Sequence, residues 1–490
     1  MVLEICRAVR DAGGRAMLVG GSVRDLLLNL ESKDFDLEVY GLSPARLREV
    51  LESVAPVNTV GEQFAVYKLA FLRPGAAATA SESAASSDFD HAVAPVSDSG
   101  IQSSSARPAP NRIEIDVSIP RRESKSGPGH RGFLITGDPS MTFQEAARRR
   151  DFTVNAILFD PLSSETIDPA GGVGDLNRKL LRAVAADTFV EDSLRVLRAM
   201  QLAARFEMSI ELNTVELCRS IDLSDLPRER VWGEFEKLLL HSRRPSIGLQ
   251  AALDLGILDK LFPAIRALVG CPQDPLIHGA GDVFTHTKLA LDQAANLTES
   301  LPKPQRAAVM LGVLLHDLGK PTMTIDRMGK PGDSAHDEAG VLPATEVLDA
   351  LGIHTMDGYH LRSQVLALVR EHLRPGQLYE LGASAPDGAF RRLARSVDLG
   401  LLYLVAKADA LGGGHVATAV AAEWFIHRAR EIGVEHGPPP PLLLGRHLIE
   451  AGVEPGRRMG EILREVYELQ LDGKVTTWEE ARNAAQRLMR

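Results

Sequence analysis

The chain has 490 residues, with 65 acidic side chains against 55 lysines and arginines, and a formal net charge of −10 at pH 7. Because contacts to nucleic-acid phosphates need lysine and arginine, this balance excludes broad, nonspecific coating of nucleic acid and leaves only local basic tracks open. The length predicts about three domains with room for sizeable cores.

Cysteine usage and apolar patterning indicate the compartment. Cys6, Cys218 and Cys271 are too scattered for a disulfide framework or a thiolate metal site, and they suit a reducing environment. The first residues lack a basic stretch ahead of an apolar core, which argues against a signal peptide. No apolar run approaches the roughly 20 residues that span a bilayer. We therefore expect a cytoplasmic protein without a membrane segment.

The stretch from Gly20 to Leu37 is the most informative part of the chain. An apolar run over 16–19 predicts a β-strand, and the Gly20-Gly21 pair behind it opens a short helix. A second strand is expected to start at Asp34. Helical spacing predicts an apolar face on the helix, formed by Val23, Leu26, Leu27 and Leu30.

Asp34 and Asp36 flank Phe35 at the start of that second strand. Side chains alternate along a strand, so the two carboxylates share one face while Phe35 points into the core. Paired carboxylates repel each other unless a cation lies between them, and an all-oxygen pair suits Mg²⁺. The glycine pair lets backbone approach a phosphate chain. The order of these elements predicts a site for a metal-bound nucleoside triphosphate.

The string Gly-Gly-Ser-Val-Arg-Asp over 20–25, followed by Asp-Phe-Asp over 34–36, resembles the class II tRNA nucleotidyltransferase and bacterial poly(A) polymerase family. That family carries Gly-Gly-x-Val-Arg-Asp and then Asp-x-Asp. The resemblance implies a nucleotidyltransferase head in which Asp34 and Asp36 hold Mg²⁺. It also implies nucleotide binding by Gly20, Gly21, Arg24 and Asp25.

A second acidic strand is predicted at 112–119, where Glu114 and Asp116 share one face and isoleucines the other. Asp116 is a candidate third catalytic carboxylate, and a half-exposed strand with outward acids is the alternative. Another strand is predicted at 64–72. Between the two, residues 75–110 are rich in Ala, Ser and Pro and cannot bury enough surface to order, so a disordered insertion is expected there.

Two further sequence motifs resemble substrate-binding motifs of the same family. The string Arg-Arg-Asp-Phe-Thr-Val-Asn-Ala over 149–156 is nearly identical to a family motif, which implies that Arg150, Asp151 and Asn155 hold the ribose and triphosphate. The string over 191–198 is expected to open a helix on which Asp192 and Arg195 share a face.

The pair at Asp192 and Arg195 has two interpretations. An ordinary intrahelical salt bridge is one. The other is a base-selecting edge, in which the carboxylate accepts from the amine shared by cytosine and adenine and the guanidinium donates to the adjacent ring nitrogen. The resemblance favours this second role and extends nucleotide binding to Arg198.

A separate constellation lies further along the chain. His316-Asp317-Leu318-Gly319-Lys320 follows an apolar helical run, and imidazole with carboxylate suits a divalent transition metal. Together with His286 before it and His336, His372 and Asp409 after it, this motif resembles the HD phosphohydrolase superfamily. It implies an all-helical domain that hydrolyses phosphomonoesters or cyclic phosphodiesters at a metal-activated water. The candidate metal ligands are His286, His316, Asp317, His336, His372 and Asp409.

The predicted fold class is α+β, with a small mixed sheet followed by all-α domains. We expect a nucleotidyltransferase head over 1–160, a helical base-recognition and RNA-binding domain over 161–265, an HD domain over 266–415 and a helical tail over 416–490.

The predicted function is template-independent addition of C and A from CTP and ATP to the 3′ end of tRNA, with no membrane and no obligate protein partner. The alternatives are a poly(A) polymerase, a CC-adding or an A-adding enzyme. Bacterial poly(A) polymerases tend to carry Gly-Arg-Arg-Phe where this chain has Gly-Glu-Gln-Phe over 61–64, which favours tRNA. An HD phosphohydrolase with a non-catalytic head and a noncatalytic RNA-binding scaffold are further alternatives.

Overall fold

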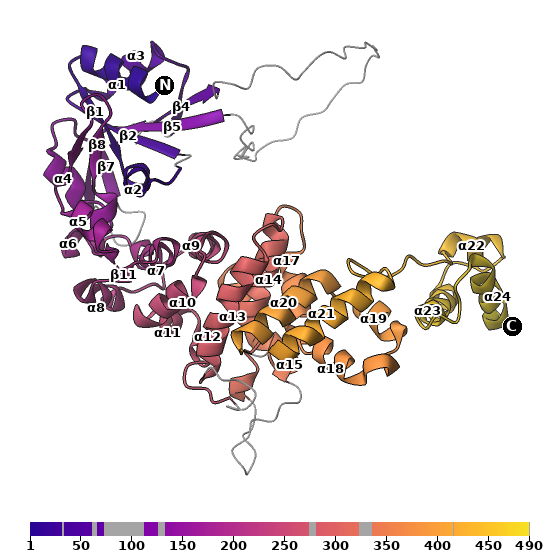
Figure 1. Ribbon diagram of the computed structural model, residues 1–490. Helices are drawn as coiled ribbons and strands as arrows, with labels where there is room; N and C mark the ends of the chain where they lie inside the picture. Colours follow the sequence, from indigo (N-terminus) through magenta and orange to yellow (C-terminus); the bar gives the residue numbers. More distant parts are fainter. Residues whose placement is uncertain are drawn as a thin grey trace, which may run out of the picture. The chain divides into compact units, whose positions relative to one another are not determined.

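The computed structural model describes residues 1–31, 34–60, 66–72, 112–125, 133–273, 281–322, 336–414 and 416–489. The predicted insertion over 75–110 and the string over 61–64 lie outside these residues. The chain forms two compact units, Met1–Glu191 and Asp192–Arg490. Figure 1 shows a sheet with helices in the first unit and helices throughout the second. The predicted α+β class with a mixed sheet in the head is confirmed.

The head is built on one seven-stranded sheet of order β3-β4-β5-β2-β1-β8-β9. β2 and β5 run parallel, and the other neighbouring strands run antiparallel. The strands are β1 (Arg15–Val19), β2 (Asp34–Tyr40), β3 (Val57–Val60), β4 (Val66–Leu72), β5 (Arg112–Ser118), β8 (Leu158–Asp160) and β9 (Glu165–Ile167).

The central strands are covered on both faces. Ala16 and Leu18 of β1 belong to one buried cluster, whereas Met17 and Val19 belong to another, because alternate side chains point to opposite faces. The head also holds a hairpin of β6 (Arg121–Lys125) and β7 (Phe133–Gly137). Its helices are α1 (Val2–Asp11), α2 (Gly21–Leu27), α3 (Pro44–Glu52), α4 (Phe143–Arg148), α5 (Gly172–Asn177) and α6 (Ala186–Phe189).

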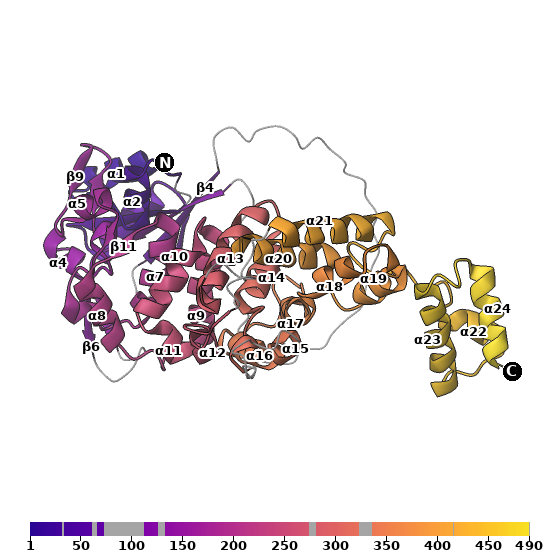
Figure 2. The same ribbon diagram turned by 60° about the horizontal axis from the view of Figure 1, so that its bottom comes forward.

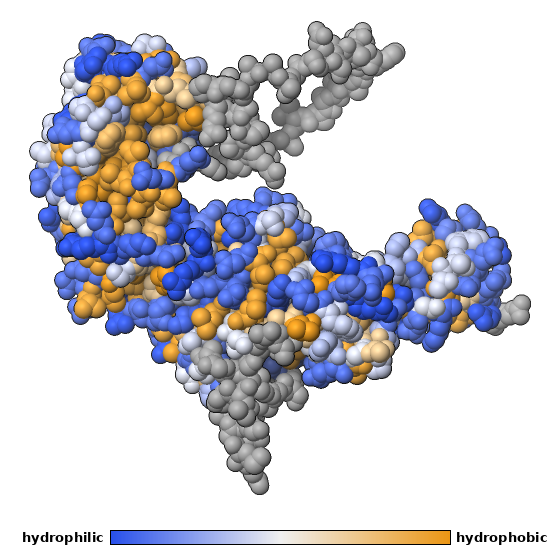
Figure 3. All heavy atoms as spheres, viewed as in Figure 1, coloured by the Kyte–Doolittle hydropathy of each residue, from blue (hydrophilic) through white to orange (hydrophobic). Residues whose placement is uncertain are grey.

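α2 differs from the predicted amphipathic helix. It ends at Leu27, and of the four expected apolar residues only Val23 is buried. Leu26, Leu27 and Leu30 are 48%, 37% and 49% exposed. A seven-residue helix makes only about two turns. The buried side chain of Arg24, which donates to Asn155, occupies part of the covered face of this helix. Apolar residues gather over the head on the face that Figure 3 shows.

The sheet continues past the predicted domain boundary at residue 160. β9 follows that position, and the compact unit extends to Glu191. The short strands β8 and β9 pair as a hairpin at the edge of the sheet. A helical pattern in the following sequence does not predict this hairpin.

Among the described residues, the regular structure of the second unit is helical apart from the two-residue strand β11 (Ser209–Ile210). Its helices are α7 (Leu194–Phe206), α8 (Leu212–Ser220), α9 (Arg228–His241), α10 (Pro245–Asp254), α11 (Ile257–Leu261), α12 (Pro263–Arg266), α13 (Val283–Leu297), α14 (Lys303–Leu315), α15 (His336–Ala339), α16 (Val341–Ala350), α17 (Leu361–Glu371), α18 (Arg374–Leu381), α19 (Asp387–Leu393), α20 (Leu399–Gly412), α21 (Val416–Glu431), α22 (Gly445–Glu450), α23 (Arg457–Leu471) and α24 (Trp478–Met489).

Helix α14 is the centre of this unit. Every residue from Ala307 to Leu315 is buried, and α14 packs against α9, α13, α17 and α20 (Figure 1 and Figure 2). Helix α20 approaches α13 closely at Gly412, where an added Cβ would lie 2.5 Å from the backbone nitrogen of Ala290. Among the described residues, no helix is long and apolar enough to cross a membrane.

Candidate active sites

The parallel pairing of β2 with β5 aligns the acids of the head. Asp34 lies opposite Glu114 and Asp36 opposite Asp116, so the predicted carboxylates share one face of the sheet. Phe35 packs against the buried cluster on the other face. Asp34 and Asp36 are exposed and Asp116 is half-exposed. The structure thus brings Asp34, Asp36 and Asp116 together on one solvent-accessible face of two central strands.

The charges around Asp36 oppose one another. The protein packed around this carboxyl raises its pKa, the guanidinium of Arg150 lowers it, and the carboxylates of Asp116 and Asp34 raise it again. Lys68 of β4 lies opposite Asp116, with its Nζ 3.2 Å from Oδ2. A carboxylate cluster whose mutual repulsion raises a pKa is suited to an oxygen-preferring cation such as Mg²⁺.

Gly20 brings backbone directly to this site. Its φ of 73° lies in the left-handed region that favours glycine. An added Cβ would lie 3.3 Å from Nη1 of Arg150 and 3.6 Å from Oδ2 of Asp36. Glycine at this position therefore leaves room for an arginine and a carboxylate beside the turn.

A cavity of about 290 Å³ opens at the carboxylate face. Its polar lining combines two acids with three arginines that come from β6 and the end of α4. The guanidinium of Arg149 donates to the backbone carbonyl of Arg121. The lining residues are Val19, Asp36, Glu38, Ser118, Arg121, Ala146, Arg149 and Arg150. Facing carboxylates and guanidinium groups can hold a metal-bound polyanion such as a triphosphate.

The other predicted nucleotide-binding residues of the head form a buried network. Arg24 is 5% exposed; its Nη2 lies 2.6 Å from Oδ1 of Asp25, and its Nη1 donates to Oδ1 of Asn155 at 2.7 Å. Asn155 donates to Oδ1 of Asp151 at 3.1 Å. These hydrogen bonds connect the Gly-Gly motif with the Arg-Arg-Asp motif, although the two motifs are far apart in sequence. Its members are not among the residues that line the cavity.

Asp192 lies before helix α7 and not on it, which corrects the expected helix start. Helix α7 begins at Leu194, and Oδ1 of Asp192 accepts from its backbone N–H at 3.1 Å. Oδ2 of Asp192 lies 3.5 Å from Nη2 of Arg230. The backbone carbonyl of Asp192 also accepts from the N–H of Arg195 at 3.0 Å, so a turn leads from Asp192 into the helix, whose N-cap is Ser193. Arg195 and Arg198 lie on α7 itself.

The six candidate ligands of the HD constellation come together in the second unit. Nε2 of His286 lies 2.8 Å from Oδ1 of Asp409, and Nε2 of His316 lies 3.2 Å from Oδ2 of Asp317. Nε2 of His336 lies 3.5 Å from Oδ1 of Asp317 and 3.2 Å from Nε2 of His372. These residues come from α13, the ends of α14 and α17, the start of α15, and α20.

Two overlapping groups in this cluster have the compactness of a metal site. Among the described residues, the trios of donor atoms within 4.8 Å of one another are His286 with His316 and Asp317, and Asp317 with His336 and His372. Asp317 belongs to both trios and is 1% exposed. The geometry therefore offers one shared carboxylate with imidazoles on either side, a donor set that suits a divalent transition metal.

Backbone contacts orient two of the imidazoles. Nδ1 of His316 lies 2.8 Å from the carbonyl of Val313, and Nδ1 of His372 lies 2.7 Å from that of Val369. A carbonyl only accepts, so each Nδ1–H donates and each Nε2 faces the cluster. The buried Nε2 of His316 makes no hydrogen bond with the described residues. An unsatisfied buried nitrogen that faces carboxylates is a suitable metal donor.

The charges of the cluster favour a cation. Burial alone would lower the pKa of His316, but the carboxylates of Asp317 and Asp409 raise it to about 10. Burial would raise the pKa of Asp317, but His316 and Lys320 hold it well below its usual value. For His372, burial and the neighbouring His316 and His336 outweigh the carboxylates of Asp317 and Asp409 and lower its pKa to about 4. His372 is therefore neutral at pH 7, and a neutral imidazole can ligate a metal.

Sequence reasoning missed several residues at these sites. Glu38 lines the head cavity, and the alternation of β2 that places Asp34 and Asp36 on one face continues to it. Lys68 pairs with Asp116 across two strands, which no local pattern reveals. Lys320 belongs to the quoted motif, and its Nζ lies 2.7 Å from Oδ2 of Asp317 and 3.1 Å from Oε1 of Gln273.

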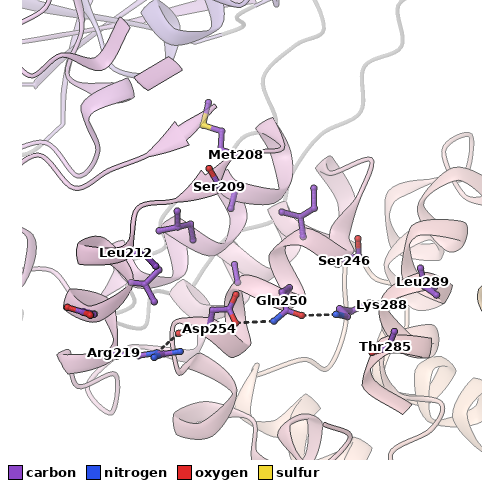
Figure 4. Close-up of a pocket in the computed structure, with 16 residues that line it drawn as sticks. Met208, Ser209, Leu212, Arg219, Ser246, Gln250, Asp254, Thr285, Lys288 and Leu289 are labelled. Carbon is purple, nitrogen blue, oxygen red and sulfur yellow. Dashed lines mark hydrogen bonds between the residues drawn. The ribbon is translucent and has the colours of Figure 1, made fainter. Parts of the chain in front are cut away.

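A larger cavity of about 740 Å³ lies in the second unit, among β11, α8, α10 and α13 (Figure 4). Lys288 donates to Gln250 at 2.7 Å, and Gln250 donates to Asp254 at 3.0 Å, so these polar lining groups pair with one another. None of the predicted site residues lines this cavity.

Comparisons with known proteins cover both sites. Residues 16–182 match the model of the poly A polymerase head domain, residues 207–268 the model of a probable RNA and SrmB-binding site of polymerase A, and residues 283–412 the HD domain. The chain is 33% identical over 414 residues to the multifunctional CCA protein of Xanthomonas campestris pv. campestris strain B100, covering 82% of this chain and 86% of that protein. It is 34% identical to that of Mannheimia succiniciproducens, covering 69% and 70%.

Solved structures show the same fold. A CCA-adding enzyme with CTP aligns over 99% of this chain and 94% of its own, with a TM-score of 0.59 and 18% identity. A Thermotoga maritima CCA-adding enzyme complexed with tRNA aligns over the same shares, with a TM-score of 0.55 and 19% identity.

Proposed function

The chain belongs to the multifunctional CCA protein family, and we propose that it adds C and A from CTP and ATP to the 3′ end of tRNA without a template. The observation that carries this proposal is the head cavity, where Asp36 and Glu38 of β2 line one space with three arginines, and Asp116 of β5 lies opposite Asp36. The relatives named CCA proteins and the solved CCA-adding enzymes with CTP or tRNA support the same substrates.

In the proposed reaction, the 3′-oxygen of the tRNA forms a bond to the α-phosphorus of the nucleotide. The bond from that phosphorus to the pyrophosphate oxygen breaks, and the hydroxyl proton is released. Asp34, Asp36 and Asp116 would hold two Mg²⁺ ions, which would supply activation of the hydroxyl and stabilisation of the leaving pyrophosphate. Arg150 and Arg149 face the cavity from the end of α4 and would contact the triphosphate.

The buried network behind the cavity supports the site. Arg24, Asp25, Asp151 and Asn155 would fix the turn at Gly20 and Gly21 relative to Arg150. Their hydrogen bonds to one another favour an indirect part in nucleotide binding, through the position of the glycine turn.

Base selection is proposed for residues at the start of α7. The carboxylate of Asp192 would accept from the exocyclic amine of cytosine or adenine, and the guanidinium of Arg195 would donate to the adjacent ring nitrogen. Guanine and uracil lack this amine in that position and would be rejected. Arg198, one turn further along α7, belongs to the same proposed nucleotide-binding set.

Addition to defined tRNA ends tests the proposal. Purified protein is incubated with tRNA that lacks CCA, ends in C or ends in CC, and with CTP or ATP alone. We expect two C additions followed by one A, each dependent on the preceding end. Long A-tails on generic RNA without C incorporation would instead identify a poly(A) polymerase, and a stop after CC or a requirement for a CC end would identify a partial enzyme.

We further propose that the HD cluster is a metal phosphohydrolase. The two trios that share Asp317 provide imidazole and carboxylate donors for a divalent transition metal, which would activate a water for attack on phosphorus. Hydrolysis of a phosphomonoester and of a cyclic phosphodiester, measured with Ni²⁺, Co²⁺ or Mn²⁺, tests this activity. No hydrolysis with any of these metals would contradict it.

We place both reactions in the cytoplasm, since Cys6, Cys218 and Cys271 are free thiols that suit a reducing compartment.

A further inference from the structure

Glu38 is a buried acid in a cavity proposed to bind an anion. It lies on the same face of β2 as Asp34 and Asp36, but it is only 9% exposed whereas they are open to solvent. A buried carboxylate is costly unless hydrogen bonds or opposite charges compensate it. A further negative charge beside a triphosphate would also weaken nucleotide binding. Its presence in the lining therefore calls for a specific role.

Each oxygen of Glu38 has its own partner. The hydroxyl of Tyr40 donates to Oε2 at 2.6 Å, and Nη2 of Arg150 lies 3.4 Å from Oε1. Tyr40 is itself fixed, since its buried ring packs edge-on against Phe143 of α4 with ring centroids 4.7 Å apart. With Oε2 held by Tyr40, Oε1 is directed at the guanidinium.

Arg150 has a second carboxylate within reach. A Cβ on Gly20 would lie 3.3 Å from Nη1 of Arg150 and 3.6 Å from Oδ2 of Asp36, so both groups lie against the same small glycine. Two carboxylates thus lie near one guanidinium, and one of them is a proposed metal ligand.

We propose that Glu38 is a positioning residue, which holds the guanidinium of Arg150 on the triphosphate side of the cavity and so leaves Asp36 available to the metal-bound nucleotide. The proposal rests on the proposed function of the head cavity. Without the Glu38 carboxylate, Arg150 would pair with Asp36, and both the phosphate contact and the metal ligand would be weakened.

Equilibrium binding of CTP to the full chain, measured by calorimetry without tRNA, tests this role. Glu38→Gln keeps the shape of the side chain and removes its charge. We expect about 10-fold weaker CTP binding, on the scale of one charge-assisted hydrogen bond, and a matching rise in KM with a smaller change in kcat. Tyr40→Phe removes only the hydroxyl that orients Glu38, and we expect a smaller loss in the same direction.

A double-mutant cycle separates positioning from general support of the fold. If Glu38 acts through Arg150, Glu38→Gln causes no further loss of CTP binding once Arg150→Gln is present. Glu52→Gln on the exposed surface of α3, where Glu52 pairs with Arg48 at 2.8 Å, is the matched control and leaves CTP binding unchanged.

The outcomes distinguish the inference from the function on which it rests. Unchanged CTP binding in Glu38→Gln, or a loss that adds fully to that of Arg150→Gln, overturns the positioning role alone. Unchanged CTP binding in Arg150→Gln overturns the proposed triphosphate contact, and the positioning role with it.

Discussion

The head cavity and the HD cluster both contain several carboxylates, but these differ in their exposure to solvent. In the head, Asp34 and Asp36 are exposed and the side chain of Asp116 is 35% exposed. In the HD cluster, the four histidines and Asp317 are buried, and donor atoms already lie within 4.8 Å of one another in two trios. The head is suited to a metal that arrives with its substrate, and the HD cluster to a metal that stays bound.

The basic side chains around the carboxylates also differ between the two sites. Lys68 and Arg150 lie beside the carboxylates of the head, and Arg121 and Arg149 line the same cavity. Such cations attract a polyanion. In the HD cluster, Lys320 lies against Asp317, and the other close partners of the carboxylates are imidazoles. The arginines of the head thus suit a polyanion, whereas the HD cluster has the donor groups of a metal site.

The largest expected effect comes from separating the two chemistries. Asp36→Ala removes a proposed Mg²⁺ ligand and should lower nucleotide addition by at least about 10³-fold while HD hydrolysis is retained. His316→Ala should do the reverse. Both activities are measured on the same preparations. Nucleotide addition that survives in Asp36→Ala would show that the metal site of the head is assigned wrongly. If neither substitution changes the result of either assay, a noncatalytic scaffold would be favoured.

Metal retention sharpens the comparison. After extensive dialysis, the HD cluster should retain a transition metal and the head should retain none, as measured by elemental analysis of the full chain. His372→Ala removes one ligand and should weaken this metal binding by more than about 10-fold. The matched control is His354→Ala, since His354 is an exposed histidine of the same unit. Equal metal loss in the two variants would contradict the cluster as a metal site.

The buried network of the head gives a stability prediction. Arg24→Gln leaves Asp25 without its charged partner and removes the bond to Asn155, and should lower the free energy of unfolding of the head by about 3 kcal/mol. Arg46→Gln, which affects an exposed pair with Glu49, should cost less than about 1 kcal/mol. Thermal unfolding measures both. HD metal binding should not respond to either change.

A structural carboxylate of the head provides the smallest effect. Burial would raise the pKa of Asp175, but hydrogen bonds from Arg182, Thr153 and Arg178 lower it below 3.8. Because the folded pKa is the lower one, the stabilisation is fully present above pH 3.8 and is lost as pH falls through the folded value. The stability difference between wild type and Asp175→Asn should therefore shrink below that pH. Asp11→Asn on α1 is the exposed control, and a difference that grows in acid would contradict this prediction.

Local patterns predicted much of the framework and the chemistry-bearing residues. The order of strand, glycine turn, helix and strand agrees with β1, α2 and β2, and the alternation of Asp34, Phe35 and Asp36 agrees with their exposure. Such features depend on neighbours in sequence. The structure also brings all six HD candidates together, which the helical spacing alone did not require.

Features that depend on tertiary contacts were not predictable in this way. The pairing of Lys68 with Asp116 follows from strand order, and the burial of Arg24 follows from partners more than a hundred residues away. The same network explains why the leucines of α2 are exposed. Asp192 lies before the N-cap of α7, and its carboxylate accepts the backbone N–H of Leu194, a local hydrogen bond that helical periodicity does not predict.

Sequencing of 3′ ends after incubation with CTP and ATP together tests the central claim most directly. The substrate is tRNA that lacks CCA, and Asp36→Ala serves as the inactive control. We expect wild type to convert these ends to a single CCA and to stop there, with no extension by the variant. Runs of A without preceding C, or the same extension by Asp36→Ala, would contradict the assignment of CCA addition to the head.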